Sequence, residues 1–240
     1  MGIVSTLVDP YSMRARLQPA LLTLLPACAA LLAISPALLE PVRSTLLLAA
    51  ALGGALLLSN VARDAGKGIE SRLWSAWDGK PSMAMLRHRD TRIAASVKAR
   101  YHKRLGQILK RAFPTAQEET SDPAGADAVY EAANSWMLAN SRDQEKFQAL
   151  FAENITYGFR RNLLGLRGWV LASCFLALVA IALAYFTPLL PTKPDTIAVL
   201  AAATSVPIYA IGFLVVVRRS WVRRAAEAYG FRLLETVDRV

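Results

Sequence analysis

Basic side chains are concentrated near the middle of the chain, close to several aromatic residues. Segment 87–111 contains nine lysines and arginines and one acid, Asp90. Guanidinium groups form paired hydrogen bonds with phosphate oxygens, and aromatic rings stack on bases. The sequence therefore predicts a site for a nucleotide or a short single-stranded nucleic acid. Its candidate binding residues are Arg87, His88, Arg89, Arg92, Arg100, Lys103 and Arg104, with Trp74, Trp77 and Tyr101 nearby.

An acidic segment follows, because residues 115–135 include five acids and no base. This neighbourhood allows two further interpretations of the charge. The two patches can solvate helix faces or pair with one another across neighbouring subunits. Alternatively, basic residues beside apolar stretches bind the anionic inner leaflet of a membrane, at roughly 1 kcal/mol each. The candidates for that membrane-surface role are Arg160, Arg161, Arg218, Arg219, Trp221, Arg223 and Arg224.

Little in the sequence supports catalysis. It contains no HExxH, GxSxG, GxGxxG or P-loop motif, and its acids form no evident catalytic pair. His88 and Asp90 could serve as a base and its orienting partner, but a histidine among basic residues is more often a phosphate contact. Cys28 and Cys174 lie in apolar runs, and two histidines are too few for most metal centres. We therefore expect a protein that is not an enzyme and has no metal or cofactor.

The elements that must position the basic cluster are unusually apolar. Hydrophobic residues make up 54% of the 240 residues, and the mean hydropathy is +0.31, which is high for a soluble domain. Four stretches without charge, 17–39, 44–62, 168–186 and 196–217, are each long enough to cross a bilayer as a helix. The sequence predicts an all-α membrane protein with four transmembrane helices in two hairpins and a helical cytoplasmic domain between them.

The charge distribution predicts the topology. The expected segments are the N-terminus (1–16), a first transmembrane hairpin (17–62), a helical domain (63–167), a second hairpin (168–217) and a basic tail (218–240). An even number of spans places the three segments outside the hairpins on one side, with 26 of the 28 lysines and arginines. Positive residues are retained in the cytoplasm. We therefore expect both termini and the central domain to be cytoplasmic.

The central domain carries several helix signals. The second span is expected to continue through 63–77 as a stalk, although Gly66 and Gly68 each weaken a helix by about 1 kcal/mol. A second helix is expected over 91–113, ended by Pro114, and a third from Asp122 and Pro123 to about residue 139. Ser141 and Gln144 form a capping-box pattern for a last helix that continues into the third span.

The spans contain hydroxyl and amide side chains but no ionisable residue, which argues against an ion-coupled carrier. The candidate pore-lining or helix-packing residues are Gly53, Gly54, Ser59, Asn60, Thr204, Ser205 and Pro207. Four helices alone cannot enclose a pathway. A conduit would need several copies in a ring, so we expect a cyclic homo-oligomer in the lipid bilayer, for example a tetramer.

The stretch 68–82 (GIESRLWSAWDGKPS), followed by Leu86-Arg87-His88-Arg89-Asp90, resembles the membrane effectors of bacterial Hailong-type anti-phage defence systems. In that family the corresponding tryptophan loop more often has two glycines where this chain has Asp78-Gly79. The resemblance implies an oligomeric channel that is controlled by a nucleotide or oligonucleotide made by a nucleotidyltransferase encoded nearby. It also implies Arg87, His88 and Arg89 as ligand contacts, supported by Trp77 and Lys80.

These observations together predict a pore of the bacterial inner membrane, gated by an anionic ligand at its cytoplasmic domain and able to depolarise an infected cell. A membrane-anchored interaction module that conducts nothing is the first alternative. A passive facilitator for a small solute is the second. The sequence does not favour opening or closing as the effect of the ligand.

Overall fold

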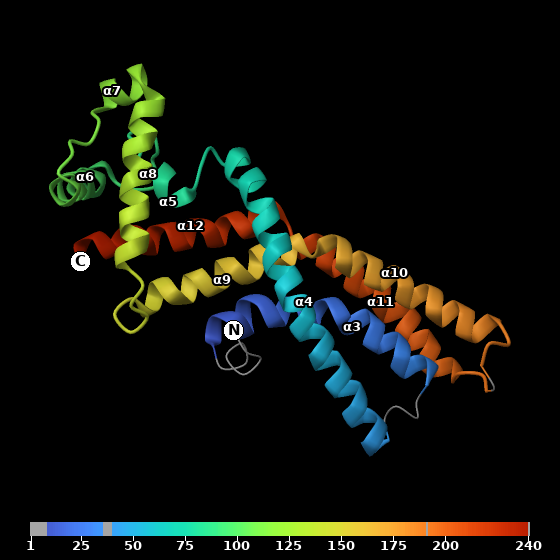
Figure 1. Cartoon of the computed structure of the whole chain (residues 1–240). Coiled ribbons are helices and arrows are strands. Elements are labelled where there is room, and N and C mark those ends of the chain that lie inside the picture. Colours follow the sequence, from blue (N-terminus) through green and yellow to red (C-terminus); the bar gives the residue numbers. More distant parts are fainter. Residues whose placement is uncertain (1–8, 36–39, 191, 240) are drawn as a thin grey trace. The chain divides into compact units, whose positions relative to one another are not determined.

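The computed structural model describes residues 9–35, 40–190 and 192–239, and these residues form helices, turns and loops without a β-strand (Figure 1). The helices are α2 (Pro10–Ser12), η1 (Met13–Leu17), α3 (Gln18–Ile34), α4 (Pro41–Ala76), α5 (Pro81–Ala84), α6 (Ala95–Leu109), α7 (Ala116–Ser121), α8 (Pro123–Asn140), α9 (Gln148–Gly165), α10 (Arg167–Phe186), α11 (Thr196–Val216), α12 (Arg219–Glu235) and η3 (Thr236–Asp238). The predicted all-α class is confirmed.

Four helical regions are long and apolar enough to cross a membrane: Pro10–Ile34, Arg43–Ala84, Arg167–Phe186 and Thr196–Val216. They contain the four stretches expected from the sequence, except that the predicted end of the first span lies partly outside the described residues. The second stretch continues without interruption into α4's charged half, as the stalk prediction requires. The third span, α10, is separate from α9, because Leu166 (φ −82°, ψ 1°) interrupts the helical geometry between them. The prediction that the last helix of the central domain continues into the third span is therefore wrong.

The chain divides into two compact units. The first, unit 1, comprises Met1–Ile69 and Gly158–Val222, and the second, unit 2, comprises Glu70–Tyr157 and Arg223–Val240. Helices α4, α9 and α12 contribute residues to both units. The C-terminal residues therefore belong to the same compact unit as the centre of the chain.

The core of unit 1 is formed by α3, α10 and α11, which lie side by side (Figure 1). Buried residues of α10 recur three and four positions apart, at Val170, Cys174, Ala177 and Ile181. This spacing places them on one face of a helix. Small side chains such as Ala177 allow neighbouring backbones to approach closely, which is how membrane helices gain packing energy.

Pro26, in the middle of α3, leaves a backbone carbonyl without its usual donor. Proline has no N–H, so Leu22, four residues earlier, receives no intrahelical hydrogen bond from position 26. The hydroxyl of Tyr209, on α11, donates to this carbonyl at 2.8 Å. An unpaired carbonyl would be costly in a region without water. Tyr209 therefore compensates for the proline and joins α3 to α11.

Pro19 creates the same requirement about two turns earlier. Its missing N–H leaves the carbonyl of Ala15, which lies in the π-helix η1, without an α-helical donor. Asn162, on α9, donates its Nδ2 to this carbonyl at 2.7 Å and is fully buried. Its Oδ1 accepts hydrogen bonds from the guanidinium of Arg161. The base of the first span is thus joined to α9 through one amide side chain.

Two glycines of unit 1 allow α4 and α9 to touch. A Cβ atom on Gly66 would lie 2.0 Å from Oδ1 of Asn162, and one on Gly165 would lie 2.6 Å from the carbonyl carbon of Ala65. Gly68, two residues further along α4, has no heavy atom within 4 Å of its Cβ position. Gly66 therefore serves close packing and Gly68 does not, although both lower helix propensity equally.

The core of unit 2 joins residues from distant parts of the chain. Tyr101 and Leu105 of α6, Tyr130 and Met137 of α8, and Leu233 of α12 are all buried in one cluster. The helix expected over 91–113 thus contributes to this core. The helix itself is shorter than predicted, beginning at Ala95 and ending where Lys110 adopts a left-handed conformation (φ 49°), four residues before Pro114.

Capping was predicted correctly at one helix and wrongly at another. Asp122 caps α8 by accepting a hydrogen bond from the N–H of Gly125 at 2.9 Å, as expected from the Asp-Pro pair. The predicted capping box at Ser141 and Gln144 is wrong. Asp143 instead accepts from the N–H groups of two residues in a turn, and α9 begins later, at Gln148. The carboxylate of Asp143, which precedes α9, therefore accepts the backbone hydrogen bonds expected at Ser141.

Replacing Tyr209 by phenylalanine tests the compensation of Pro26. The variant should lose about 1 kcal/mol of stability, the typical range for a hydrogen bond between membrane helices, as measured by thermal unfolding in detergent. In a Pro26→Ala background, the N–H of residue 26 can serve Leu22, so the same replacement should cost less than half as much. Equal costs in both backgrounds would contradict the proposed coupling.

Glycine-to-alanine replacements test the packing of α4 on α9. Gly165→Ala should lower the free energy of unfolding by about 2 kcal/mol, because the added methyl group collides with the backbone of α4. Gly68→Ala is the matched control and should raise it by up to about 1 kcal/mol through helix propensity. The close contact would be refuted if both variants had the same unfolding midpoint in detergent.

Candidate anion-binding site

The predicted basic cluster begins in the loop that ends α4. Asp78 and Gly79 both have positive φ, 61° and 111°, and the N–H of Gly79 donates to the carbonyl of Trp74 at 2.8 Å. Left-handed geometry is easiest for glycine and tolerable for aspartate. Two consecutive positive φ values favour glycine at both positions. In this chain the first position carries a carboxylate instead.

Arg87 is buried and fully paired. Its guanidinium forms two parallel hydrogen bonds with the carboxylate of Asp127, both at 2.8 Å, and contacts the carboxylate and the carbonyl of Asp78 at 2.8 and 2.6 Å. Its side chain is 5% exposed, whereas those of Asp78 and Asp127 are 73% and 36% exposed. Burial opposes its charge, but the bonds with Asp127 and the charge of Asp78 outweigh this effect and raise the pKa of Arg87.

Two other buried charges hold the backbone of the loop 87–90. The ammonium of Lys98, on α6, donates to the carbonyls of Arg87 and Asp90. The carboxylate of Glu119, on α7, accepts from the N–H of His88 at 2.7 Å and from the N–H of Arg89 at 3.4 Å. Backbone N–H and carbonyl groups of the loop thus bond to charged side chains, and such hydrogen bonds are stronger than those between two neutral groups. The loop is therefore a rigid support for its side chains.

The buried charges have shifted pKa values with separate causes. Burial lowers the pKa of Lys98, even though nearby Asp90 favours its charged form. For Glu119, burial acts in the opposite direction to its hydrogen bonds, which prevail and lower the pKa of this carboxyl. Burial also lowers the pKa of His102, to about 4. His102 is therefore neutral at pH 7, and its Nε2 contacts the carbonyl of Leu86 at 2.7 Å.

An open depression of about 430 Å³ lies beside this loop. We call it the arginine pocket. Its lining residues are Trp77, Asp78, Ala84, Arg87, Arg89, Asp90, Thr91, Arg92 and Arg223. Four guanidiniums and two carboxylates therefore line it, and two further carboxylates, Asp127 and Glu227, pair with these guanidiniums from outside the lining. Arg89 and Arg223 are the accessible members, with side chains 56% and 46% exposed.

Each arginine of the pocket already has an internal carboxylate partner. Arg89 pairs with Asp78 at 2.9 Å, and Arg223 pairs with Glu227 at 2.9 Å. Arg92 contacts Asp90 and, at 3.0 Å, Glu227. An entering anion would therefore have to compete with carboxylates. Exposed pairs contribute only about 0–1 kcal/mol, so phosphate oxygens can displace Asp78 from Arg89 more easily than Asp127 from Arg87.

The structure brings four of the nine predicted ligand-binding residues to the pocket: Trp77, Arg87, Arg89 and Arg92. Lys80 pairs with Glu131, Arg100 pairs with Asp238 at 2.9 Å, and the ring of His88 contacts the carbonyl of Pro114 at 2.8 Å. Lys103 is exposed beside a separate depression. Arg104 does not line the arginine pocket.

The residues predicted for the membrane surface have different surroundings. Arg160 stacks on the ring of Trp221 at 4.8 Å, and Arg161 is buried against Asn162. Arg223 lines the arginine pocket. The remaining predicted members, Arg218, Arg219 and Arg224, are exposed.

Side chains predicted to line a pore or pack helices mostly bond to their own helix. Ser59, Thr204 and Ser205 each donate to a carbonyl three or four residues earlier. A Cβ atom on Gly53 would have no heavy atom within 4 Å, whereas one on Gly54 would lie 3.5 Å from Cδ1 of Leu24. Asn60 is exposed, and α11 continues through Pro207.

Sequence reasoning missed the residues that hold the cluster in place. Asp127 and Glu119 belong to the acidic segment 115–135. The closeness of this segment to the basic segment 87–111 was the sequence feature that could have indicated their pairing. The expected pairing across subunits occurs within one chain at Arg87 and Asp127. No sequence signal indicated that Arg223 lines the arginine pocket, because Arg223 lies more than 130 residues from Arg89 in the sequence. Within the described residues, no three His, Cys, Asp or Glu side chains form a metal-ligand group.

The fold and the pocket together define an all-helical chain with four potential membrane spans and an arginine-lined depression in its second unit. Comparisons with protein-family models, curated proteins and solved structures find no match.

Arg87 and Arg89 share Asp78 as a partner, and alanine replacements should separate their roles. Arg87→Ala should lower the free energy of unfolding by about 3 kcal/mol, because it leaves partly buried carboxylates without their cation. Arg89→Ala should change it by less than about 1 kcal/mol, because the pair is exposed. Chemical unfolding in detergent measures both. Similar losses for the two variants would contradict the distinction between an anchor and an accessible arginine.

Proposed function

We propose that the chain is the subunit of an oligomeric membrane pore, whose opening is controlled by an anionic ligand of the nucleotide or oligonucleotide type. The ligand binds in the arginine pocket. Arg89 and Arg223 contact its phosphate oxygens, and Arg87 supplies fixed positive charge from behind. Trp77, although largely buried, offers an aromatic edge at the same pocket. The protein is not an enzyme.

One observation carries this proposal: the pocket is linked through the chain to two candidate spans. Trp77 and Asp78 follow directly on Ala76, the last residue of α4, whose first half is the second span. Arg223 lies in the first turns of α12, which starts three residues after the end of α11, the fourth span. A ligand held between the 77–92 loop and Arg223 therefore acts on the ends of helices that enter the membrane.

The exposed ion pairs provide a switch of low energetic cost. A phosphate group that takes Arg89 from Asp78 and Arg223 from Glu227 exchanges weak surface pairs for charge-assisted, two-pronged bonds. A ligand can shift a conformational equilibrium only by its difference in affinity for the two states. If the ion pairs Arg89–Asp78 and Arg223–Glu227 form in only one of the two states, the ligand has to displace them in that state alone, and this gives the required difference in affinity. The buried pair of Arg87 and Asp127 persists in both states.

The membrane arrangement proposed is two hairpins with both termini and unit 2 in the cytoplasm of a bacterium. The excess of lysine and arginine outside the hairpins supports this topology. Self-association is supported by the apolar part of α4, where Leu46, Leu48 and Leu57 are 65%, 70% and 76% exposed. Lipid or a second copy of the chain must cover them. The role in anti-phage defence rests on the sequence resemblance of the tryptophan loop.

Flux through proteoliposomes tests the function. The purified chain should release a small fluorescent dye at a rate that changes at least tenfold on addition of pyrophosphate, ATP or a short oligoadenylate. Arg89→Gln combined with Arg223→Gln should remove that response, because the accessible cations are lost. Arg232→Gln is the matched control, since Arg232 pairs with Glu235 outside the pocket.

Two results would reject the proposal. A chain that never conducts, with or without these anions, would be a membrane anchor and not a pore. A ligand response that survives in the double variant would place the ligand elsewhere. Circular dichroism of each variant in detergent shows whether the helical fold is retained.

A further inference from the structure

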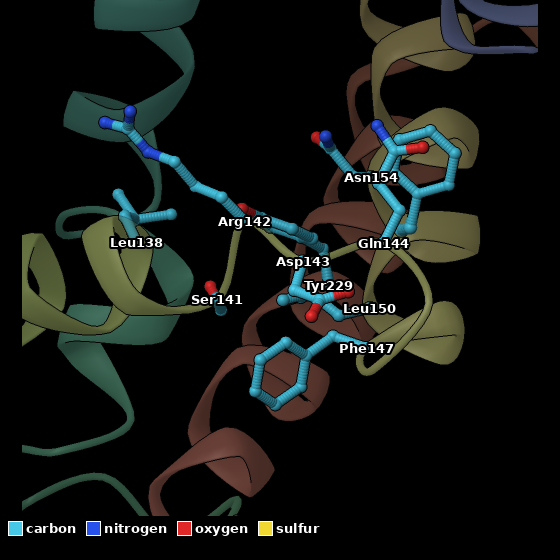
Figure 2. Close-up of a pocket in the computed structure, with 10 residues that line it drawn as sticks. Leu138, Ser141, Arg142, Asp143, Gln144, Phe147, Leu150, Asn154 and Tyr229 are labelled. Carbon is cyan, nitrogen blue, oxygen red and sulfur yellow. The ribbon is translucent and has the colours of Figure 1, made fainter. Parts of the chain in front are cut away.

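A second pocket of unit 2 lies where α8 turns into α9, against α12 (Figure 2). It measures about 220 Å³, and the residues that matter most to its chemistry are Ser141, Gln144, Phe147, Phe151, Asn154 and Tyr229. Figure 2 shows Gln144 and Asn154 on one side of the pocket, with the side chain of Arg142 extending toward the other. None of these residues lines the arginine pocket.

The pocket contains polar groups that the fold does not use. Within the described part of the chain, the side-chain amides of Gln144 and Asn154 and the hydroxyl of Ser141 have no hydrogen-bond partner. Nearby Asn140 differs, because its Nδ2 donates to the carbonyl of Trp136 at 2.9 Å. Each free amide offers donors and an acceptor in one plane. Gln144 is exposed and Asn154 is half-buried, so both amides are accessible to a ligand.

Aromatic side chains provide the remaining surface. Phe147 is 4% exposed, Phe151 and Tyr229 are half-buried, and all three line the same space as the amides. Aromatic faces favour flat, unsaturated rings stacked on or against them. Amides at the rim of an aromatic pocket can bond the edge of such a ring, as asparagine and glutamine do with adenine. The pocket therefore has separate groups for the face and the edge of one ligand.

Size and charge restrict the ligand further. A liquid water molecule occupies about 30 Å³, so the pocket displaces roughly seven waters, and it is smaller than the roughly 300 Å³ minimum usual for drug-sized ligands. Arg142 and Asp143 have opposite charges and leave the lining neutral. A phosphate-bearing nucleotide is too large and too charged. A single or fused heterocycle without charge fits both limits.

We propose that this pocket binds a small, neutral, planar heterocycle with adjacent hydrogen-bond donor and acceptor, of the size of a free nucleobase or nicotinamide. Asn154 and Gln144 bond its edge, and Phe147, Phe151 and Tyr229 contact its faces. This site is independent of the pore proposal, because none of its residues takes part in binding the anion.

The position of the pocket gives the ligand a regulatory role. Tyr229, on α12, stacks on Tyr157, on α9, with ring centroids 6.2 Å apart and an interplanar angle of 11°. The hydroxyl of Tyr157 donates to Glu70, on α4, at 2.9 Å. A ring that contacts Phe151 of α9 and Tyr229 of α12 together would stabilise this arrangement of three helices within unit 2. Binding to the folded chain alone would then raise its unfolding temperature.

The test uses the full chain in detergent, with adenine and nicotinamide as probes and isothermal titration calorimetry as the measurement. At least one probe should bind saturably at a single site, and Asn154→Leu should raise its Kd at least tenfold. Gln144→Leu should raise the Kd in the same direction. Asn140→Leu is the matched control and should leave it unchanged, since that amide lies outside the pocket.

Further comparisons separate this site from the arginine pocket. Adenine should bind better than AMP in the pocket, and the Arg89→Gln/Arg223→Gln variant should bind adenine like the unmodified chain. The proposal is overturned if neither probe binds, if Asn154→Leu binds as tightly as the unmodified chain, or if AMP competes as well as adenine. Unfolding midpoints of the variants without probe show that the helices remain folded.

Discussion

The arrangement of the helices in unit 2 depends on the ion pairs of one buried side chain, the guanidinium of Arg87. It joins the loop after α4 to α8 through Asp78 and Asp127, and the loop carrying it is fixed by Lys98 of α6 and Glu119 of α7. A buried charge must be paired on several sides or it destabilises the fold. Satisfying one arginine therefore brings four helices into a defined arrangement, and the accessible arginines take their positions from it.

The helices of the membrane region could be predicted well, because the rule that governs them is local. A run of some twenty uncharged apolar residues must form a helix in a bilayer, and α10 and α11 begin and end within a residue of the expected limits. The continuation of α4 beyond the apolar stretch was also predicted, although Gly66 and Gly68 lower the helix propensity there. Interruptions were harder to predict, because the break at Leu166 and the left-handed Lys110 arise from packing and have no distinctive sequence signal.

The candidate site was predicted by composition but not by geometry. Basic residues near position 87 were recognised, yet the sequence does not distinguish Arg87, which is buried, from Arg89, which is exposed. That distinction depends on Asp127, some 40 residues away, and on where α8 lies. Arg223 joins the pocket from α12, which is distant in sequence but belongs to the same compact unit. Ion pairs between residues far apart in sequence depend on the tertiary fold. The adjacent acidic and basic segments indicate only that such pairs can form, not which residues form them.

Pro19 and Pro26, the two prolines of α3, also bear on how this group of helices can move. Each leaves a carbonyl that accepts a side chain from a different helix, Asn162 of α9 or Tyr209 of α11. Sliding or rotating α3 would break both bonds at once, so these three helices form a rigid frame. In the proposed pore, α3 would therefore move together with α9 and α11, and any dilation would have to displace other helices past this stationary group.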